Sequence, residues 1–144
     1  MTTVQTILQT KGALVVSVTP ETRVSTALEL MADKNIGALV VTNDGTLAGI
    51  FSERDFARTT AAKGMGVYDR PVKDLMTSIV FTVSPNQSID ECMAVMTDRH
   101  IRHLPVLEHQ RLTGVVSIGD VVKAVISEKE HVIQQLENYI TGAR

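Results

Sequence analysis

The sequence predicts an α+β fold built from two β-α-β-β-α repeats that pack sheet to sheet with approximate two-fold symmetry. Three observations support it: an internal repeat, apolar residues whose spacing alternates between strand and helix periods, and turn-forming residues between these segments. Residues 18–56 align with residues 83–121 at a constant offset of 65 positions, and 11 of the 39 aligned pairs are identical. One repeat of about 50 residues would bury too little apolar surface to be stable alone, so we expect the two to share one core.

Composition and charge narrow the possible classes of protein. The 144 residues are 44% hydrophobic but only 3% aromatic, so aliphatic side chains must form the core. A net charge of -2 gives no general attraction to nucleic acid or to an anionic membrane. No apolar run approaches the roughly 20 residues of a membrane span, and the N-terminus lacks the pattern of a secretory signal. Cys92 is the single cysteine, which excludes an internal disulfide. A cytoplasmic location is predicted, with an organelle as the alternative.

The first repeat is expected at residues 14–66, after an N-terminal segment (1–13) with one short helical turn at 4–8. Its predicted elements are a strand at 14–18, a helix at 24–34, strands at 38–41 and 47–51, and a helix at 53–63. Asn43-Asp44-Gly45-Thr46 joins the two later strands, because an Asp-Gly pair tolerates the positive φ angles of a tight hairpin turn.

A linker at 67–78, with a short turn at 72–76, leads to the second repeat at 79–127. The predicted elements are a strand at 79–83, a helix from 89 to 99, strands at 103–107 and 112–116, and a helix at 118–126. Ser88 and Glu91 have the spacing of a capping box, in which side chains satisfy the free backbone donors at a helix start.

The C-terminal segment, 128–144, is predicted to form a separate amphipathic helix, opened by a cap at Ser127 and ending near residue 140. Its apolar residues share one face: Val132, Ile133, Leu136, Tyr139 and Ile140. This face either docks on the chain's own core or meets a second copy of the chain.

Both repeats carry the same polar pattern where their last strand gives way to a helix. Gly49 to Asp55 and Gly114 to Asp120 each place a serine at the junction and an aspartate three residues later. A helix start offers free N–H groups that suit phosphate, and a carboxylate there can accept both hydroxyls of a ribose. The alternative is that each pattern is only a helix cap, and the two roles are compatible.

The duplicated unit, the Ile-Arg-His-Leu-Pro-Val stretch at 101–106 and the two Gly-x-x-Ser-x-x-Asp stretches resemble a pair of CBS domains, named after cystathionine β-synthase. Together with the Gln-Leu-Glu-Asn-Tyr-Ile tail at 135–140, they resemble the small stand-alone CBS-pair proteins of bacteria and plant organelles. This resemblance implies regulatory binding of adenosine-containing ligands in two clefts between the repeats. It also implies that two pairs join into a flat, disc-like homodimer.

By that resemblance, the first cleft is expected to use Asp55 for the ribose and Ser52 near the phosphate, with residues borrowed from the second repeat. Arg102 is a planar, permanently charged donor that can hold a phosphate through two hydrogen bonds. The alternative places Arg102 and His103 on the surface at a strand end or in a pair with Glu53. The full expected set is Ile50, Ser52, Arg54, Asp55, Arg58, Thr82, Arg102 and His103.

The second cleft is expected to bind more weakly, to stay empty, or to hold one end of a larger ligand. Asp120 and Ser117 suit a ribose, but the borrowed positions carry no charge, and Gly119 stands where the first repeat has Arg54. The sequence therefore offers little there to neutralise a phosphate. The full expected set is Ser17, Gly37, Ala38, Val115, Ser117, Gly119 and Asp120.

Other chemistry finds little support in the sequence. The four histidines and Cys92 lack metal-ligand spacing, no Ser, His and Asp set suggests nucleophilic catalysis, and there is no phosphate-binding glycine loop. The leading hypothesis is a non-enzymatic sensor that binds AMP, ADP, ATP or NAD and regulates an unknown partner in trans. The alternatives are a structural dimerisation module without a ligand and, more weakly, S-adenosylmethionine as the ligand, which the Arg102 and His103 pair disfavours.

Overall fold

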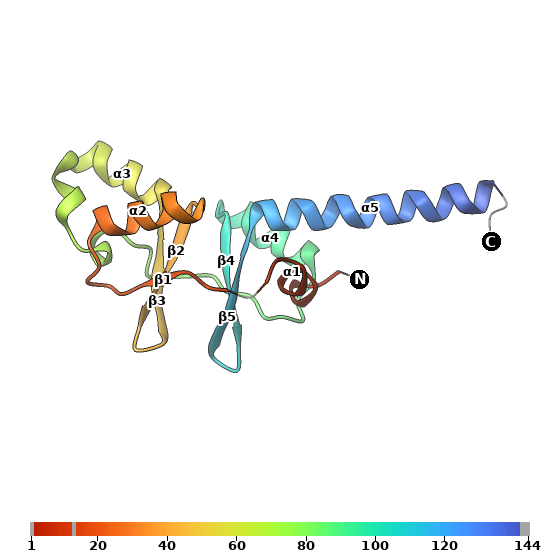
Figure 1. Cartoon of the computed structure of the whole chain (residues 1–144), viewed down its shortest axis with the longest axis horizontal. Helices are drawn as coiled ribbons and strands as arrows, with labels where there is room; N and C mark the ends of the chain where they lie inside the picture. The colour runs from red at the N-terminus through yellow and green to blue at the C-terminus, as the bar shows by residue number, and fades with distance from the viewer. Residues whose placement is uncertain (1, 13, 142–144) are drawn as a thin grey trace. The chain divides into compact units, whose positions relative to one another are not determined.

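The computed structural model describes residues 2–12 and 14–141 and has the predicted α+β composition, with two small sheets and five α-helices in this part of the chain (Figure 1). Contacts divide the chain into two compact units. The described residues of unit 1 are 2–12, 82–106 and 114–141, and those of unit 2 are 14–81 and 107–113. Each unit holds most of one repeat, and the two are described in turn.

Unit 2 holds a three-stranded sheet in the order β1-β2-β3. Strand β1 (Ser17–Val18) is parallel to β2 (Ala38–Asn43), which is antiparallel to β3 (Thr46–Ser52). Helix α2 (Val24–Lys34) precedes β2, and α3 (Glu53–Lys63) follows β3. The predicted bounds of both helices are confirmed. In the hairpin turn, Asp44 and Gly45 have φ angles of 51° and 81°, as the Asp-Gly pair predicts.

Unit 1 combines an N-terminal helix with most of the second repeat. Helix α1 (Val4–Lys11) joins α4 (Ile89–Arg99) and α5 (Ile118–Ile140). The paired strands β4 (His103–Glu108) and β5 (Arg111–Ser117) also belong to this unit, except for residues 107–113, which are assigned to unit 2. The predicted capping box opens α4, where the Ser88 hydroxyl accepts from the backbone N–H of Glu91 at 3.1 Å.

The strand predicted at 79–83 does not form. In unit 1, a single parallel bridge between Val83 and Val106 replaces the pairing that β1 and β2 form in unit 2. The predicted strand at 14–18 is likewise reduced to Ser17–Val18. The first apolar side chain of each predicted strand lies outside the cores, since Ile79 is 84% exposed and Leu14 is 86% exposed.

The N-terminal segment holds the position in unit 1 that the end of the linker holds in unit 2. The backbone N–H of Val4 donates to the carbonyl oxygen of Gln87 at 2.9 Å, and that of Val72 donates to Thr22 at 2.7 Å. Gln87 and Thr22 are equivalent positions of the repeat. Helix α1 therefore corresponds to the short 3₁₀ turn Val72–Asp74, so a helical segment completes each repeat.

Two equivalent glycines allow these segments to pack closely on the sheets. A Cβ atom added at Gly49 would lie 2.7 Å from the carbonyl oxygen of Thr77 and 2.9 Å from the sulfur of Met76. A Cβ atom added at Gly114 would lie 2.6 Å from Cδ2 of Leu8. Both distances are too short for a real contact, so a side chain at either position would require the segment packed against it, or the Leu8 side chain, to move.

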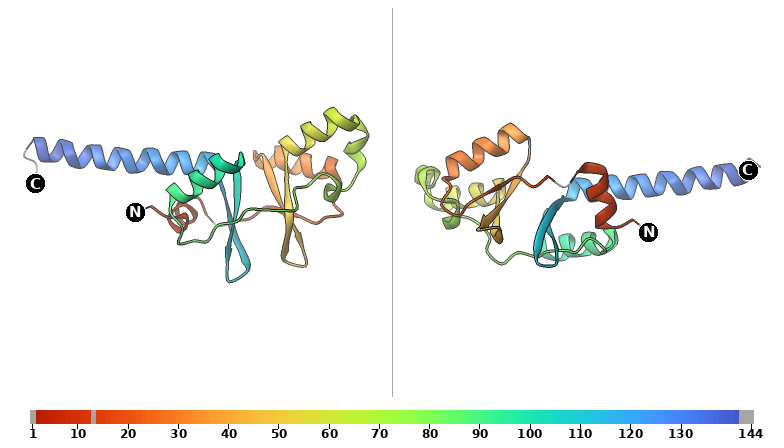
Figure 2. Two further views of the ribbon diagram at one scale, coloured as in Figure 1. Left: turned by 180° about the vertical axis from the view of Figure 1, so that it is seen from behind. Right: turned by 60° about the horizontal axis from the view of Figure 1, so that its bottom comes forward.

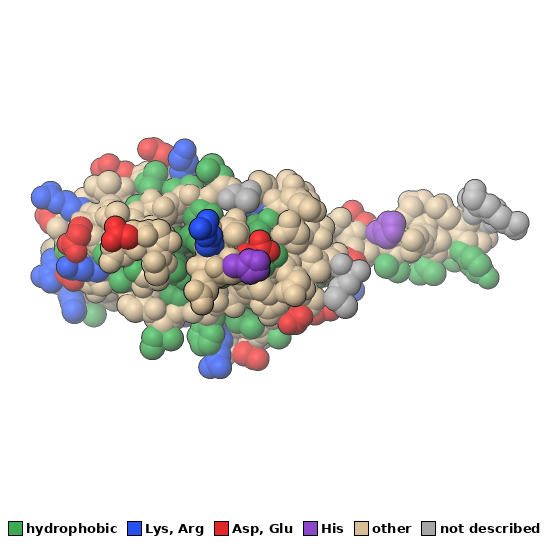
Figure 3. All heavy atoms as spheres, turned by 90° about the horizontal axis from the view of Figure 1, so that it is seen from below, with side chains coloured by type: hydrophobic (Ala, Val, Ile, Leu, Met, Phe, Trp, Pro, Cys, Tyr) green, Lys and Arg blue, Asp and Glu red, His purple; other side chains and the backbone are tan. Residues whose placement is uncertain are grey.

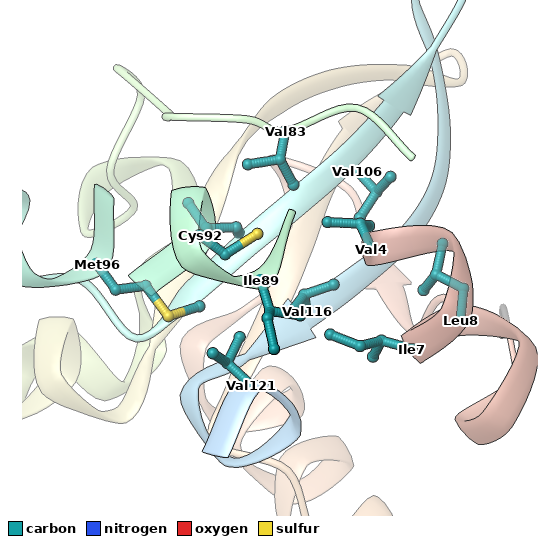
Figure 4. Close-up of a cluster of buried hydrophobic side chains, with 11 residues drawn as sticks. Val4, Ile7, Leu8, Val83, Ile89, Cys92, Met96, Val106, Val116 and Val121 are labelled. Carbon is teal, nitrogen blue, oxygen red and sulfur yellow. The ribbon is translucent and has the colours of Figure 1, made fainter. Parts of the chain in front are cut away.

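Each unit has its own aliphatic core. Helix α1 contributes Val4, Ile7 and Leu8 to the core of unit 1, where they lie near Ile89 and Val116 (Figure 4). The unit 1 core comprises Val4, Ile7, Leu8, Val83, Ile89, Cys92, Met96, Leu104, Val106, Val116 and Val121. That of unit 2 comprises Val18, Val24, Ala27, Met31, Leu39, Val41, Phe51, Val67, Val72 and Leu75. Cys92 and its counterpart Ala27 are both fully buried, which confirms that Cys92 is a small core residue.

Helix α5 is continuous from Ile118 to Ile140, so the predicted break at Ser127 is wrong. Neither glycine nor proline follows Asp120 within this helix, and nothing in the sequence forces the chain out of it. The helix extends well beyond the rest of unit 1, with apolar side chains along one side of its far half (Figures 2 and 3). Val132, Ile133 and Leu136 are 48%, 54% and 56% exposed, so this face does not dock on the chain's own core.

Candidate functional site

The first candidate site is the capping box at the start of α3. The Ser52 hydroxyl accepts from the backbone N–H of Asp55 at 3.1 Å, and the backbone N–H of Ser52 donates to Oδ2 of Asp55 at 2.9 Å. The other carboxylate oxygen, Oδ1, accepts a longer hydrogen bond of 3.3 Å from the hydroxyl of Thr77. The backbone N–H and the hydroxyl of Ser52 thus hold Oδ2 of Asp55, while the neutral and weakly held side chain of Thr77 covers Oδ1.

The second candidate site, at the start of α5, repeats this box with the same distances. The Ser117 hydroxyl accepts from the N–H of Asp120 at 3.1 Å, and the N–H of Ser117 donates to Oδ2 of Asp120 at 2.9 Å. Here, however, a cation is present. The Lys11 ammonium lies 2.7 Å from Oδ2 of Asp120 and also donates to the carbonyl oxygen of Val115 at 2.9 Å.

Lys11 also changes the protonation of this site. Partial burial on its own would raise the pKa of Asp120. The hydrogen bonds from Lys11 and from the Ser117 backbone, together with the charge of Lys11, outweigh that effect and hold the pKa below its ordinary value. Asp120 is therefore ionised at neutral pH and already engaged by a cation.

The expectation that the Asp120 site lacks a cation is therefore wrong. The repeat alignment could not show the pair, because Lys11 and Asp120 are 109 residues apart. One signal was available: Val4, Ile7, Leu8 and Lys11 share one face of a helix, so the lysine continues the stripe that faces the core. Thr77 was also missed, since it lies in a segment interpreted only as a linker.

The remaining site residues are divided between the two units. Within unit 2, Ala38 is the register partner of Ser52, and the carbonyl oxygen of Gly37 accepts from the N–H of Glu53 at 3.0 Å. Within unit 1, the carbonyl oxygen of Arg102 accepts from the N–H of Ile118 at 2.8 Å in the equivalent bond. Unit 2 carries Ser17, Gly37, Ala38, Ile50, Ser52, Arg54, Asp55 and Arg58, and unit 1 carries Thr82, Arg102, His103, Val115, Ser117, Gly119 and Asp120. Each unit thus presents one complete capping box, and the assignment of residues to clefts stays a prediction.

The comparison with known families identifies the repeats. The CBS domain family matches residues 15–61 and 72–127, which together make up most of the chain. The chain belongs to the CBS-domain family. The second matched segment begins at the 3₁₀ turn that packs with unit 2, and each match includes one Ser-x-x-Asp capping box.

Known CBS-domain proteins resemble the chain along most of its length. The mitochondrial CBS domain-containing protein CBSX3 of Arabidopsis thaliana is 37% identical, over 98% of this chain and 73% of that protein. A solved protein with CBS domains from Burkholderia ambifaria is 46% identical, with a TM-score of 0.84 over 88% of this chain and 95% of that one. One from Agrobacterium tumefaciens is 41% identical, with a TM-score of 0.84 over 85% and 98% of the two chains.

A more distant structure, the CBS domain pair of protein MJ0100, is 22% identical with a TM-score of 0.79 and holds 5′-methylthioadenosine and S-adenosyl-L-methionine. CBS-pair proteins are regulatory modules, and some of them bind adenosine ligands. In the part of this chain that the structure describes, no cluster of three His, Cys, Asp or Glu residues could hold a metal ion. None of the described helices has the length and apolar character to cross a membrane.

Proposed function

We propose that the chain is a non-enzymatic regulatory module that binds an adenine nucleotide (AMP, ADP, ATP or NAD) and modulates a partner protein in trans. The observation that carries this proposal is the pair of matching capping boxes. Each presents an ionisable carboxylate, held by its own serine, at a strand-to-helix junction of a CBS domain. The adenosine ligands in the MJ0100 domain pair support the choice of ligand class.

The chemistry of a capping box suits a ribose. The serine N–H holds one oxygen of the carboxylate, so the group is already oriented before a ligand arrives. A ribose offers two neighbouring hydroxyl donors, and a hydrogen bond to an ionised acceptor is stronger than one between neutral groups. The partial positive charge at the same helix start favours a phosphate nearby.

Charged side chains complete the proposal for the Asp55 site. We assign the phosphate to the three arginines predicted there, Arg54, Arg58 and Arg102. His103 would add a hydrogen bond, with Ser52 and Thr82 as hydroxyl contacts. A nucleotide that binds one conformation of the module better than another shifts the population toward that conformation, and a partner protein can respond to the shift. A cytoplasmic homodimer remains our prediction for the working form.

Titration calorimetry on the full chain tests this function, with AMP, ADP, ATP, NAD and S-adenosylmethionine as separate ligands. Binding of at least one nucleotide is expected, and Asp55→Asn should weaken it by about tenfold or more, since a charged acceptor is lost. Asp33→Asn serves as the control, because Asp33 is also a helical aspartate but is exposed and belongs to neither capping box. No binding of any of these ligands contradicts the proposed function.

A second candidate function is a structural dimerisation module that binds no ligand. The exposed apolar face of α5 favours it, because side chains such as Ile133 and Leu136 have no partner among the described residues that covers them. This candidate predicts that none of the five ligands changes the melting temperature and that Leu136→Gln lowers the molecular mass in solution.

A further inference from the structure

The ion pair between Lys11 and Asp120 lies at one of the two proposed ribose sites, and its position follows from how α1 is anchored. Val4, Ile7 and Leu8 are buried in the unit 1 core (Figure 4). The spacing of Lys11 from these residues puts it on the same face of the helix. Gly12 ends the helix directly after Lys11 with a φ of 93°, a conformation that favours glycine. The lysine is therefore presented to Asp120 by a fixed element.

Two contacts show that the ammonium is held at this site. It donates to Oδ2 of Asp120 at 2.7 Å and to the carbonyl oxygen of Val115 at 2.9 Å. The Asp120 side chain is 18% exposed and that of Lys11 is 38% exposed, so the pair is partly screened from water without being sealed from it. A ligand can reach both groups.

We infer that Lys11 is the specificity-determining residue of the Asp120 site and selects nucleosides that carry a phosphate. This inference rests on the proposed function. A ribose that binds the Asp120 carboxylate competes with Lys11 for Oδ2. A neutral nucleoside leaves the displaced ammonium without an anion, whereas a phosphorylated one supplies an anion on the same ligand.

The flexibility of the lysine side chain makes this exchange feasible. Its four-carbon stem can swing the ammonium from the carboxylate to a nearby phosphate while α1 stays in place. A positively charged ligand gains nothing from the exchange and is repelled. Lys11 thereby gives the Asp120 site the phosphate preference that the uncharged Gly119 does not supply.

Calorimetry with AMP and adenosine tests the inference, using the full chain with Asp55→Asn so that the Asp120 site dominates the signal. With Lys11 present, AMP should bind more tightly than adenosine. Lys11→Met should reduce the ratio of the two affinities by about tenfold, because AMP loses a charge-assisted contact and adenosine loses a competitor. Tighter adenosine binding in this variant is the specific sign of that competition.

Two further variants separate specificity from a structural effect. Lys11→Arg keeps the charge and should keep the preference for AMP. Lys63→Met is a matched control, because Lys63 also ends a helix, α3, before a glycine with positive φ, and the ratio should not change.

The outcomes distinguish the inference from the function it rests on. An unchanged ratio in Lys11→Met, or an equal loss of both ligands, overturns the inference and leaves the proposed function standing. Loss of all binding in the Asp55→Asn chain also overturns it, since Lys11 then has no ligand to read. Failure of the unmodified chain to bind AMP or adenosine also overturns the inference, whereas the proposed function is contradicted only if ADP, ATP and NAD fail to bind as well.

Discussion

Substituting the two equivalent glycines tests whether α1 and the end of the linker play the same part in their units. At Gly49, an added methyl group would meet the Thr77 carbonyl oxygen at 2.7 Å, and that backbone atom can move only if the segment moves. At Gly114, it would meet Cδ2 of Leu8 at 2.6 Å, the end of a side chain that can rotate. Gly49→Ala should therefore destabilise the protein more than Gly114→Ala.

The expected magnitudes follow from these contacts. Overpacking of a well-packed site costs about 1–3 kcal/mol, and replacing glycine by alanine returns about 0.5 kcal/mol through the unfolded chain. Gly49→Ala should lower the free energy of unfolding by about 2–2.5 kcal/mol, near the upper end of the net range, and Gly114→Ala by about 1 kcal/mol or less. For a chain of this size, the melting temperature should fall by roughly 8–10 °C for Gly49→Ala and by up to about 4 °C for Gly114→Ala.

Urea unfolding and thermal melting measure both effects. Gly66→Ala is the control, because an added Cβ atom there meets nothing within 4 Å. It should change the free energy of unfolding by less than about 0.5 kcal/mol. A Gly114→Ala protein that is as unstable as Gly49→Ala, or two variants that are both as stable as the control, would refute the reasoning.

Three further predictions concern a cap, a charge and a surface. Ser88→Ala should lower the free energy of unfolding by about 1 kcal/mol, measured by urea unfolding, because α4 loses its capping hydroxyl. Folding lowers the pKa of Asp120, so its ionised carboxylate stabilises the folded state above the ordinary pKa of 3.8, and this stabilisation is lost as the pH falls through the folded pKa. The free energies of unfolding of wild type and Asp120→Asn should therefore converge below that pH range. Leu136→Gln should leave the melting temperature of the monomer within a few degrees, as Leu136 is 56% exposed, while lowering any self-association seen by light scattering.

Local signals in the sequence predicted most of the helices and the hairpins. The bounds of α2 and α3 follow from apolar periodicity and from a glycine after Lys63, and the β2–β3 turn follows from its Asp-Gly pair. The predictions of a strand at 79–83 and of a helix break at Ser127 are wrong for the same reason. A short apolar run and a cap-like tetrapeptide are weak signals, and the neighbouring structure overrides them. At Ser127 the helix simply continues from the turn before it.

The candidate site was predicted in part. Both capping boxes could be found because the pattern spans only four consecutive residues and occurs once in each repeat. Lys11 and Thr77 were missed, since each reaches its aspartate through tertiary packing of a segment outside the gapless alignment. The gapless alignment of the repeats has an offset of 65 residues, whereas the equivalent residues Val4 and Val72 are 68 residues apart. This difference hid the equivalence of their segments.

The most direct test of the proposed function removes the two hydroxyls from the ligand. Calorimetry compares AMP with its 2′,3′-dideoxy analogue, which keeps the adenine and the phosphate but cannot donate to a carboxylate from the ribose. If Asp55 and Asp120 read the ribose, the analogue should bind at least about tenfold more weakly to the unmodified chain. The same substitution should make little difference to a chain with both Asp55→Asn and Asp120→Asn. Equal affinities of AMP and the analogue for the unmodified chain would contradict the central claim.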